Sequence, residues 1–285
     1  MKPKLLINLL LLLLLITLGL LAWLLPGKAP ETQLESLTTH RPDGVQRLLI
    51  ERPDGTRLRF ARQAGRWQML EPYAMPANGV RLDALARVLE APVLSRFPLP
   101  LDRLAEFGLD RPLRLRLDDL QLEFGGNDPI NFHRYVRQGE QLALILDRFY
   151  HHLSASAEQL LSPALLPIDA RLQAIVTPNY RLEHGPQGWQ LTPDDPRLSA
   201  DQLAEQASAW SQAQGLSLQH FDAIDGLPEI GLTLESGERL VFGLRQQDGS
   251  NWLIRRDNGI GYRLPGDSPL LSPPQPAVEQ GAKEQ

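Results

Sequence analysis

The chain has 285 residues, and its 29 Lys and Arg against 34 Asp and Glu give a net charge of −5 at pH 7. It has no cysteine, which excludes disulfide bonds, thiolate metal sites, a cysteine nucleophile and an acylated lipoprotein cysteine. The sequence shows no basic patch large enough to neutralise a phosphate backbone, so we expect no nucleic-acid partner.

An uncharged apolar run extends from Leu5 to Leu25. As a helix it would be about 30 Å long, which is enough to cross the hydrocarbon core of a bilayer. Lys2 and Lys4 lie on a short stub, residues 1–4, and a positive short flank predicts that this end stays in the cytoplasm. We therefore predict a single-pass membrane anchor with a cytoplasmic N-terminus and the rest of the chain on the other side of the membrane.

A cleavable signal peptide is the alternative interpretation of this run. Its apolar core would be shorter, roughly 7–15 residues, and would end in a small-residue cleavage site. Here the run is longer, ends in Trp23 and Pro26-Gly27, and has no A-x-A pattern at a usable distance. Trp suits the membrane interface and Pro-Gly ends a helix, so we favour an uncleaved anchor followed by a polar spacer, residues 26–37.

Alternating apolar and polar residues predict a first α+β module over residues 38–167. Strands are expected at 47–51, 57–60, 67–70, 93–97, 113–117, 120–124, 132–136 and 142–146, and helices at 80–90 and 149–161. The strands form a hairpin followed by a third strand, and then, after the first helix, a four-stranded meander. Such a sheet is expected to be antiparallel, with one face covered by the helix.

The same landmarks return later in the chain. Trp189 follows Trp67 by 122 residues, Gly243 follows Gly125 by 118, and Gly259 follows Gly139 by 120. Several landmarks in one order at nearly one offset indicate an internal duplication, so we predict a second α+β module over residues 168–271. The joint at residues 161–167 is apolar, which favours packed modules; pairing of the two sheets edge to edge stays open. Residues 272–285 have no apolar period, and we expect them to be disordered.

These landmarks resemble a known family. The tryptophan elements, Phe107-Gly108-Leu109, Phe124-Gly125 and Tyr135-Val136 are similar to the bacterial membrane-anchored family catalogued as domain of unknown function 4340, over roughly residues 67–244. The family is defined by fold-bearing residues, so the resemblance carries over no catalytic residue. Together with the predicted anchor, the resemblance to a bacterial family implies an inner-membrane protein whose modules lie in the periplasm. Some relatives are encoded beside ABC-transporter components, and this implies a transport-accessory or envelope role.

The candidate chemical groups are few. Asp147, His151 and the adjacent His152 could hold a metal, but one more ligand would be needed, and we favour a helix start at the core edge. The pairs Asp118-Asp119 and Asp194-Asp195 could act as acid and base, yet adjacent residues of an extended chain point to opposite faces, so we interpret both as turns. Gly125-Gly126 and Gly259-Ile260-Gly261 are interpreted as hairpin glycines, because neither leads from a strand into a helix.

Trp67 and Trp189 occupy equivalent places in the two modules. We expect each to anchor its own core; the alternative is that both line a groove between the modules. Arg114 and Arg116 lie on the non-core face of a predicted strand and matter only if that face meets a partner. We expect no enzyme, no cofactor and no metal, and hypothesise an accessory or binding subunit with an envelope protein partner. The alternative is a peptide- or glycan-binding domain, possibly hydrolytic, that uses an inter-module groove.

Overall fold

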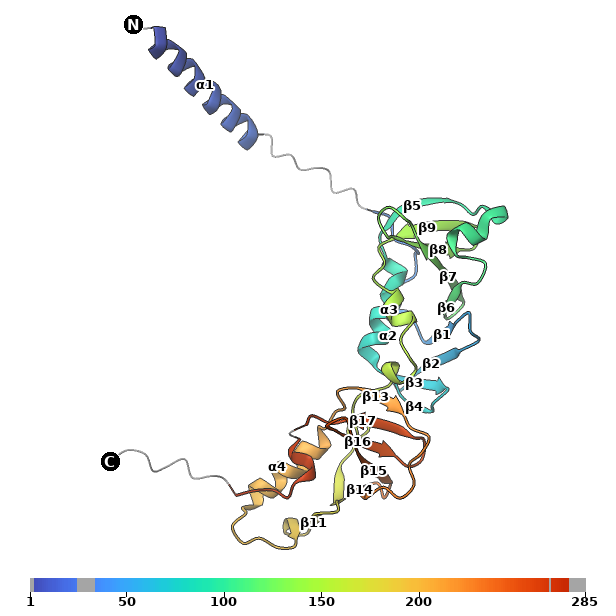
Figure 1. The fold of residues 1–285 in the computed structure, drawn as a ribbon, viewed down its shortest axis with the longest axis vertical. Helices are drawn as coiled ribbons and strands as arrows, with labels where there is room; N and C mark the ends of the chain where they lie inside the picture. The colour runs from blue at the N-terminus through green and yellow to red at the C-terminus, as the bar shows by residue number, and fades with distance from the viewer. Residues whose placement is uncertain (1–2, 25–33, 267, 277–285) are drawn as a thin grey trace. The chain divides into compact units, whose positions relative to one another are not determined.

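The computed structural model describes residues 3–24, 34–266 and 268–276, and the chain divides into two compact units, Met1–Ser36 and Leu37–Gln285 (Figure 1). Parts of several predicted segments lie outside the described residues. These are residues 1–2 of the stub, residue 25 of the apolar run, residues 26–33 of the spacer, residue 267 of the second module and residues 277–285 of the tail.

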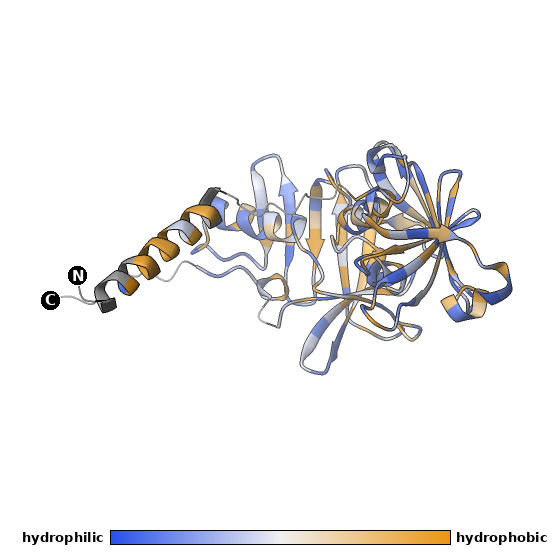
Figure 2. Cartoon of the chain, turned by 90° about the horizontal axis from the view of Figure 1, so that it is seen from above, coloured by the Kyte–Doolittle hydropathy of each residue, from blue (hydrophilic) through white to orange (hydrophobic). Residues whose placement is uncertain are grey.

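The first unit contains helix α1 (Pro3–Leu24). Its described large apolar side chains from Ile7 to Leu21 are 55–71% exposed, and Figure 2 shows the described part of the helix as mainly hydrophobic. The hydroxyl of Thr17 donates to the carbonyls of Leu13 (3.0 Å) and Leu14 (2.9 Å), so this polar group is satisfied inside the helix. Within the described residues, no helix combines the length and hydropathy that a membrane crossing requires.

The second unit contains two antiparallel sheets and few helices, which confirms the predicted α+β class. The first sheet has nine strands in the order β4-β3-β2-β1-β6-β7-β8-β9-β5. Its strands are β1 (Arg47–Glu51), β2 (Arg57–Gln63), β3 (Arg66–Glu71), β4 (Met75–Pro76), β5 (Val93–Pro98), β6 (Leu113–Leu117), β7 (Leu120–Asn127), β8 (Arg134–Gln138) and β9 (Gln141–Ile145). Its helices are α2 (Gly79–Ala86) and α3 (Tyr150–Leu153), with 3-10 turns η1 (Pro42–Gly44), η2 (Arg87–Glu90), η3 (Leu101–Phe107) and η4 (Glu158–Leu160).

The second sheet has eight strands in the order β12-β11-β10-β14-β15-β16-β17-β13. They are β10 (Leu172–Val176), β11 (Arg181–Gly185), β12 (Gly188–Thr192), β13 (Leu218–His220), β14 (Glu229–Leu234), β15 (Arg239–Gln247), β16 (Ser250–Arg255) and β17 (Ile260–Arg263), with helix α4 (Ala200–Ser211) and turn η5 (Pro269–Leu271). The order is that of the first sheet without β4, if β10–β12 match β1–β3 and β13–β17 match β5–β9. The two sheets therefore share one topology and remain separate sheets.

One face of each sheet carries the core. Leu48, Ile50, Leu58 and Phe60 alternate with outward-facing residues on β1 and β2 and are almost fully buried. Helix α2 begins at Asn78, whose side chain accepts from the Arg81 N–H (3.2 Å), and helix α4 begins with a capping box in which Ser199 and Gln202 bond reciprocally. Each helix buries one apolar stripe, and the core runs without interruption through both modules.

The joint between the modules is held by backbone hydrogen bonds on both sides. Ser162 N donates to Pro76 O (2.9 Å) in the first module, and Leu165 N donates to Ala213 O (3.0 Å) in the second. Side chains add to the contact, because Arg66 pairs with Asp169 at 2.6 Å. The two modules are packed against one another rather than loosely tethered.

A second layer covers part of the outer face of each sheet, which is the face away from the helix. In the first module, Phe107 of η3 contacts Tyr135 (ring centroids 5.0 Å apart), and Gly125 lets η3 approach the strand: a Cβ added there would lie 2.1 Å from Phe107 O. In the second, Leu227 lies over Gly243, where an added Cβ would be 3.0 Å from its side chain. The duplicated Phe-Gly pairs thus put phenylalanine in the core and glycine under the outer layer.

The predicted helix at residues 149–161 is wrong in length. Helix α3 ends at Leu153, and η4 forms only at Glu158. Arg52, which enters from the β1–β2 hairpin, donates to the carbonyls of Leu153 (Nε, 3.2 Å) and Ala155 (Nη2). Because these carbonyls bind the guanidinium group, they do not serve a continuing helix.

The structure also extends the folded part of the chain at both ends. Leu37, predicted as the last spacer residue, is buried in the core, where its N–H donates to Ala91 O (2.8 Å). At the other end, Gln202 and Gln206 of α4 donate to the carbonyls of Gln275 (3.2 Å) and Ser272 (3.4 Å), so this part of the predicted tail is held against α4.

Candidate binding surface

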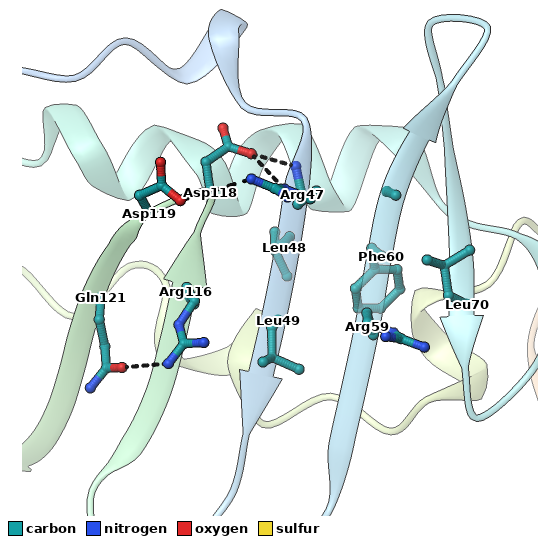
Figure 3. Close-up of a pocket in the computed structure, with 11 residues that line it drawn as sticks. Arg47, Leu48, Leu49, Arg59, Phe60, Leu70, Arg116, Asp118, Asp119 and Gln121 are labelled. Carbon is teal, nitrogen blue, oxygen red and sulfur yellow. Dashed lines mark hydrogen bonds and ion pairs between the residues drawn. The ribbon is translucent and has the colours of Figure 1, made fainter.

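A hollow of about 580 Å³ lies on the outer face of the first sheet, beside the part that η3 covers (Figure 3). We call it the arginine groove. Its lining residues are Arg47, Leu48, Leu49, Arg59, Phe60, Ala61, Leu70, Arg116, Asp118, Asp119 and Gln121. In Figure 3 a helix lies behind the strands, and the three arginines of the groove are exposed.

Strand pairing places one leucine between two arginines. Leu49 of β1 is the partner of Arg59 on β2 and of Arg116 on β6. Because side chains alternate along a strand, all three point to the outer face, and two inter-strand spacings put the two arginine Cα atoms about 10 Å apart. Half-buried Leu49, Ala61 and Leu70 provide an apolar floor between charged side chains.

The three arginines of the groove differ in their partners. Arg59 Nη2 lies 2.6 Å from Glu71 Oε1, and Arg47 lies 3.7–3.8 Å from Asp118 and Asp119. Arg116 Nη2 instead donates to Gln121 Oε1 (3.1 Å). Because this amide oxygen is neutral, it does not compensate the charge of Arg116, which can attract an incoming anion. Exposed ion pairs contribute little to stability, so these arginines are available for exchange with a partner.

The aspartate pair in the groove is a turn, as predicted. Asp118 has a φ of 50° between β6 and β7, and its carboxylate accepts from the N–H groups of Gln46 (3.1 Å) and Arg47 (2.9 Å). No serine, threonine, cysteine or histidine is among the described residues that line the groove, and its two carboxylates, Asp118 and Asp119, belong to the turn. The arrangement can bind carboxylate, phosphate or peptide groups.

The second sheet has a hollow in the equivalent place, about 650 Å³ over β10, β11, β12, β14 and β15. Its chemistry differs. By strand pairing, Ala174 takes the place of Leu49, and its partners are Glu183 and Thr233 where the first sheet has two arginines. The fold therefore repeats the hollow, and the second hollow also holds two arginines, Arg181 and Arg239, but not at the two positions beside Ala174.

A third cavity, about 300 Å³, lies between the modules. Its lining combines Trp67, Met75 and Asp83 of the first module with Arg255 and Tyr262 of the second, and with the joint. Trp67 is only 3% exposed; its Nε1 donates to Asp83 (2.8 Å), and Arg62 lies 4.6 Å above its ring. Trp67 is therefore both a core residue and a wall of this cavity.

Trp189 lies elsewhere. It is half-buried and packs edge-on against His184, with the ring centroids 5.1 Å apart. It does not line the inter-module cavity, so the structure does not bring the two tryptophans together in one groove. Its strand, β12, is the edge of the second sheet, whereas β3 with Trp67 is followed by β4 and the joint.

The remaining candidates have structural roles. Burial alone would raise the pKa of Asp147, but hydrogen bonds from Arg134 and Asn127 lower it. Asp147 forms an ion pair with Arg134 (2.6 Å). Burial, with His151 beside it, lowers the pKa of His152. In the described ranges, no group of three or more His, Asp or Glu could hold a metal ion.

In the second aspartate pair, Asp195 opens a turn, because Leu198 N donates to Asp195 O (3.1 Å). Hydrogen bonds from the side chain and backbone of Arg197 lower the pKa of Asp195 to about 2. The two arginines Arg47 and Arg59 were not singled out from the sequence as site residues. Their alternation with core residues was visible there, but the pairing of β1 between β2 and β6 was not.

The family described as domain of unknown function (DUF4340) matches residues 67–229. The chain belongs to the DUF4340 family. The matched segment runs from Trp67 on β3 to Glu229 at the start of β14, so it includes both tryptophan strands and the joint. No curated protein and no solved structure gave a significant match. The DUF4340 segment thus spans parts of both repeats and identifies a scaffold rather than a chemical activity.

Proposed function

We propose that this DUF4340 protein is a non-enzymatic binding subunit, anchored in the bacterial inner membrane and exposed to the periplasm. The observation that carries the proposal is the arginine groove. It is preformed, open to solvent and lined by guanidinium groups around an apolar floor, and Asp118 in its lining is held by the N–H groups of Gln46 and Arg47. Such a surface binds a partner better than it performs chemistry.

The partner is best described by its charge and shape. Arg59 and Arg116 flank Leu49 on adjacent strands, and among the described residues Arg116 pairs with an amide rather than a carboxylate. An extended protein segment with a carboxylate beside an apolar residue would pair with Arg116 and cover Leu49. An envelope protein that presents such a segment, in an ABC-transporter-type complex, is the partner class that the family resemblance implies.

The anchor rests on the sequence. The run from Leu5 to Leu25 contains no charge over 21 residues, and α1 is helical from Pro3 to Leu24. Exposed apolar side chains around a helix are unfavourable in water and favourable in lipid. Lys2 and Lys4 favour a cytoplasmic N-terminus, which would place the two modules in the periplasm.

Site-specific photocrosslinking in intact membranes tests the groove. A photoreactive amino acid replaces either Gln121 in the groove or Arg239 in the second sheet. The two positions correspond, because Gln121 pairs with Arg116 and Arg239 pairs with Thr233, which stands where Arg116 stands in the first sheet. The proposal expects one specific protein adduct from position 121, lost when Arg116→Thr copies the residue of the second sheet, and no such adduct from position 239. Equal adducts from both positions, or an adduct that survives Arg116→Thr, would contradict the assignment to this groove.

The inter-module cavity supports a second function, the binding of an envelope peptide or glycan. The nearly buried aromatic residues Trp67 and Tyr262 line it together with Arg255, and cavities that combine aromatic and polar groups bind peptides and sugars. Hydrolysis is disfavoured, because glycoside cleavage uses two carboxyl groups and the described lining holds one, Asp83. Soluble peptidoglycan fragments should perturb Tyr262 in NMR spectra if this function is correct, and an Ile168→Trp variant at the cavity rim should weaken that perturbation.

A further inference from the structure

The loop between β7 and β8, residues 128–133, presents two large apolar side chains to solvent. Ile130 is 80% exposed and Phe132 is 72% exposed. Single exposed hydrophobic residues are ordinary on protein surfaces. Two of them on one short loop, separated only by exposed Asn131, form a local apolar tip that needs an explanation.

The loop is built rigidly from inside. The Asp128 carboxylate accepts from the N–H groups of Ile130 (3.0 Å), Asn131 (3.2 Å) and His133 (3.1 Å). Asp128 N also donates to His133 O (2.8 Å), and Asn127 Nδ2 donates to Phe132 O (2.7 Å). Burial alone would raise the pKa of Asp128, but the backbone N–H groups of Ile130, His133 and Asn131 lower it, so the carboxylate is ionised at neutral pH.

Phe132 has a φ of 57°, in the left-handed region that bulky residues rarely adopt. The conformation costs free energy, and its aromatic ring gains no core packing in return because it faces solvent. A loop that holds an aromatic residue outward at this cost is preorganised for contact with something outside the fold.

The loop lies at the end of the sheet where the chain enters the second unit. Leu37 N donates to Ala91 O (2.8 Å), and Arg96 Nη2 donates to Leu37 O (3.1 Å), so the entering chain is fixed to the start of β5. Ile145 of β9 pairs with Val93 of β5 on one side and with Arg134 of β8 on the other, and Arg134 directly follows the loop. Arg134, at the base of the loop, and Val93, next to the entry point, are thus two strand spacings apart, about 10 Å.

Only 12 residues, 25–36, connect α1 to this entry point in the sequence, and a fully extended chain of that length reaches at most about 40 Å. If α1 is anchored in a bilayer, the entry end of the first module stays within that distance of the membrane.

We propose that the loop formed by residues 128–133 inserts Ile130 and Phe132 into the lipid interface of the membrane that holds α1. This proposal rests on the membrane anchor of the proposed function. A lipid surface suits the loop because its backbone donors at Ile130, Asn131 and His133 are already satisfied by Asp128, so none of these three N–H groups would enter the apolar layer unpaired. Phenylalanine and isoleucine gain free energy at such an interface, and the intervening Asn131 can face the headgroups.

The absence of cysteine makes a clean test possible. Full-length protein with Asn131→Cys carries an environment-sensitive fluorophore and is reconstituted into phosphatidylethanolamine and phosphatidylglycerol nanodiscs that contain a doxyl-lipid quencher. Leu216→Cys, an exposed apolar position in the second module, is the matched control, and Leu14→Cys in α1 reports the anchor separately. We expect several-fold stronger quenching at position 131 than at position 216.

Two further variants address the cause. Ile130→Ser with Phe132→Ser, or Asp128→Ala, should each return the fluorophore at position 131 to the quenching of the control. Solvent-like emission at position 131 with a quenched fluorophore at position 14 would overturn the inference while leaving the anchor intact. Solvent-like emission at both positions would contradict the anchor itself, and quenching at 131 that ignores both variants would assign the contact to another surface.

Discussion

Replacing Gly125 by alanine should loosen the outer layer of the first sheet. The new Cβ would lie 2.1 Å from Phe107 O, a backbone atom, and 3.2 Å from the Leu109 side chain. To reach van der Waals distance, η3 must move by about 1 Å or more, which forfeits its packing against Tyr135. We expect a loss of about 3 kcal/mol in the free energy of unfolding, or about 6–12 °C in Tm for a domain of this size.

The neighbouring glycine is the control. An added Cβ at Gly126 lies 3.7 Å from the nearest atom, so Gly126→Ala should change stability by less than about 1 kcal/mol. At the equivalent Gly243, the Cβ would lie 3.0 Å from Leu227 Cδ1 and 3.1 Å from Leu227 Cβ, a milder conflict than at Gly125, and about 1 kcal/mol is expected.

Denaturant unfolding of full-length protein in mild detergent, followed by tryptophan fluorescence, measures these differences. Hydrogen exchange of the amides of η3 (Leu101–Phe107) provides the local measurement, and it should speed up in Gly125→Ala alone. Equal stability and equal exchange in Gly125→Ala and Gly126→Ala would refute the packing argument, because the two variants differ chiefly in the approach of η3.

Three further outcomes are expected. Tyr180→Phe should lower the free energy of unfolding by about 3 kcal/mol, because the buried hydroxyl accepts from Trp210 Nε1 (2.7 Å) and Gln206 Nε2 (2.9 Å). An unchanged midpoint in denaturant unfolding would contradict this. The Asp195 carboxyl should titrate by NMR at about pH 2, and Arg197→Gln should return its midpoint toward 3.8; an unshifted wild-type midpoint would rule the pairing out. Because the pKa of Asp195 is lower in the folded than in the unfolded protein, the stabilisation from this pair is present above pH 3.8 and is lost as the pH falls toward 2. Arg116→Thr should remove partner crosslinking from the arginine groove with a change in unfolding free energy below about 0.5 kcal/mol, and a large destabilisation would instead make Arg116 a structural residue.

The candidate surface was only partly accessible to prediction. The alternation around Arg114 and Arg116 showed that these arginines face away from the core. It could not show that Leu49 lies between Arg59 and Arg116, because that depends on β1 pairing with both β2 and β6. Arg116 follows Leu49 by 67 residues in the chain, and a contact over such a separation leaves no local pattern in a single sequence.

The sequence by itself determined the local elements and their repetition. Period-two and helical patterns depend only on which side of an element is buried, so β1–β3, β5–β9, α2 and the duplicated Phe-Gly and tryptophan landmarks could be predicted from nearby residues. The glycines could be recognised as special, although the reason at Gly125, the approach of η3, could not.

Tertiary structure decided everything that joins distant segments. It separated the two sheets, ended α3 where Arg52 binds the carbonyls of Leu153 and Ala155, and kept Trp189 away from the cavity that Trp67 lines. The physical reason is common to all three. A side chain's partner across the fold is fixed by the packing of whole elements, and the residues next to it in the chain do not contain that information.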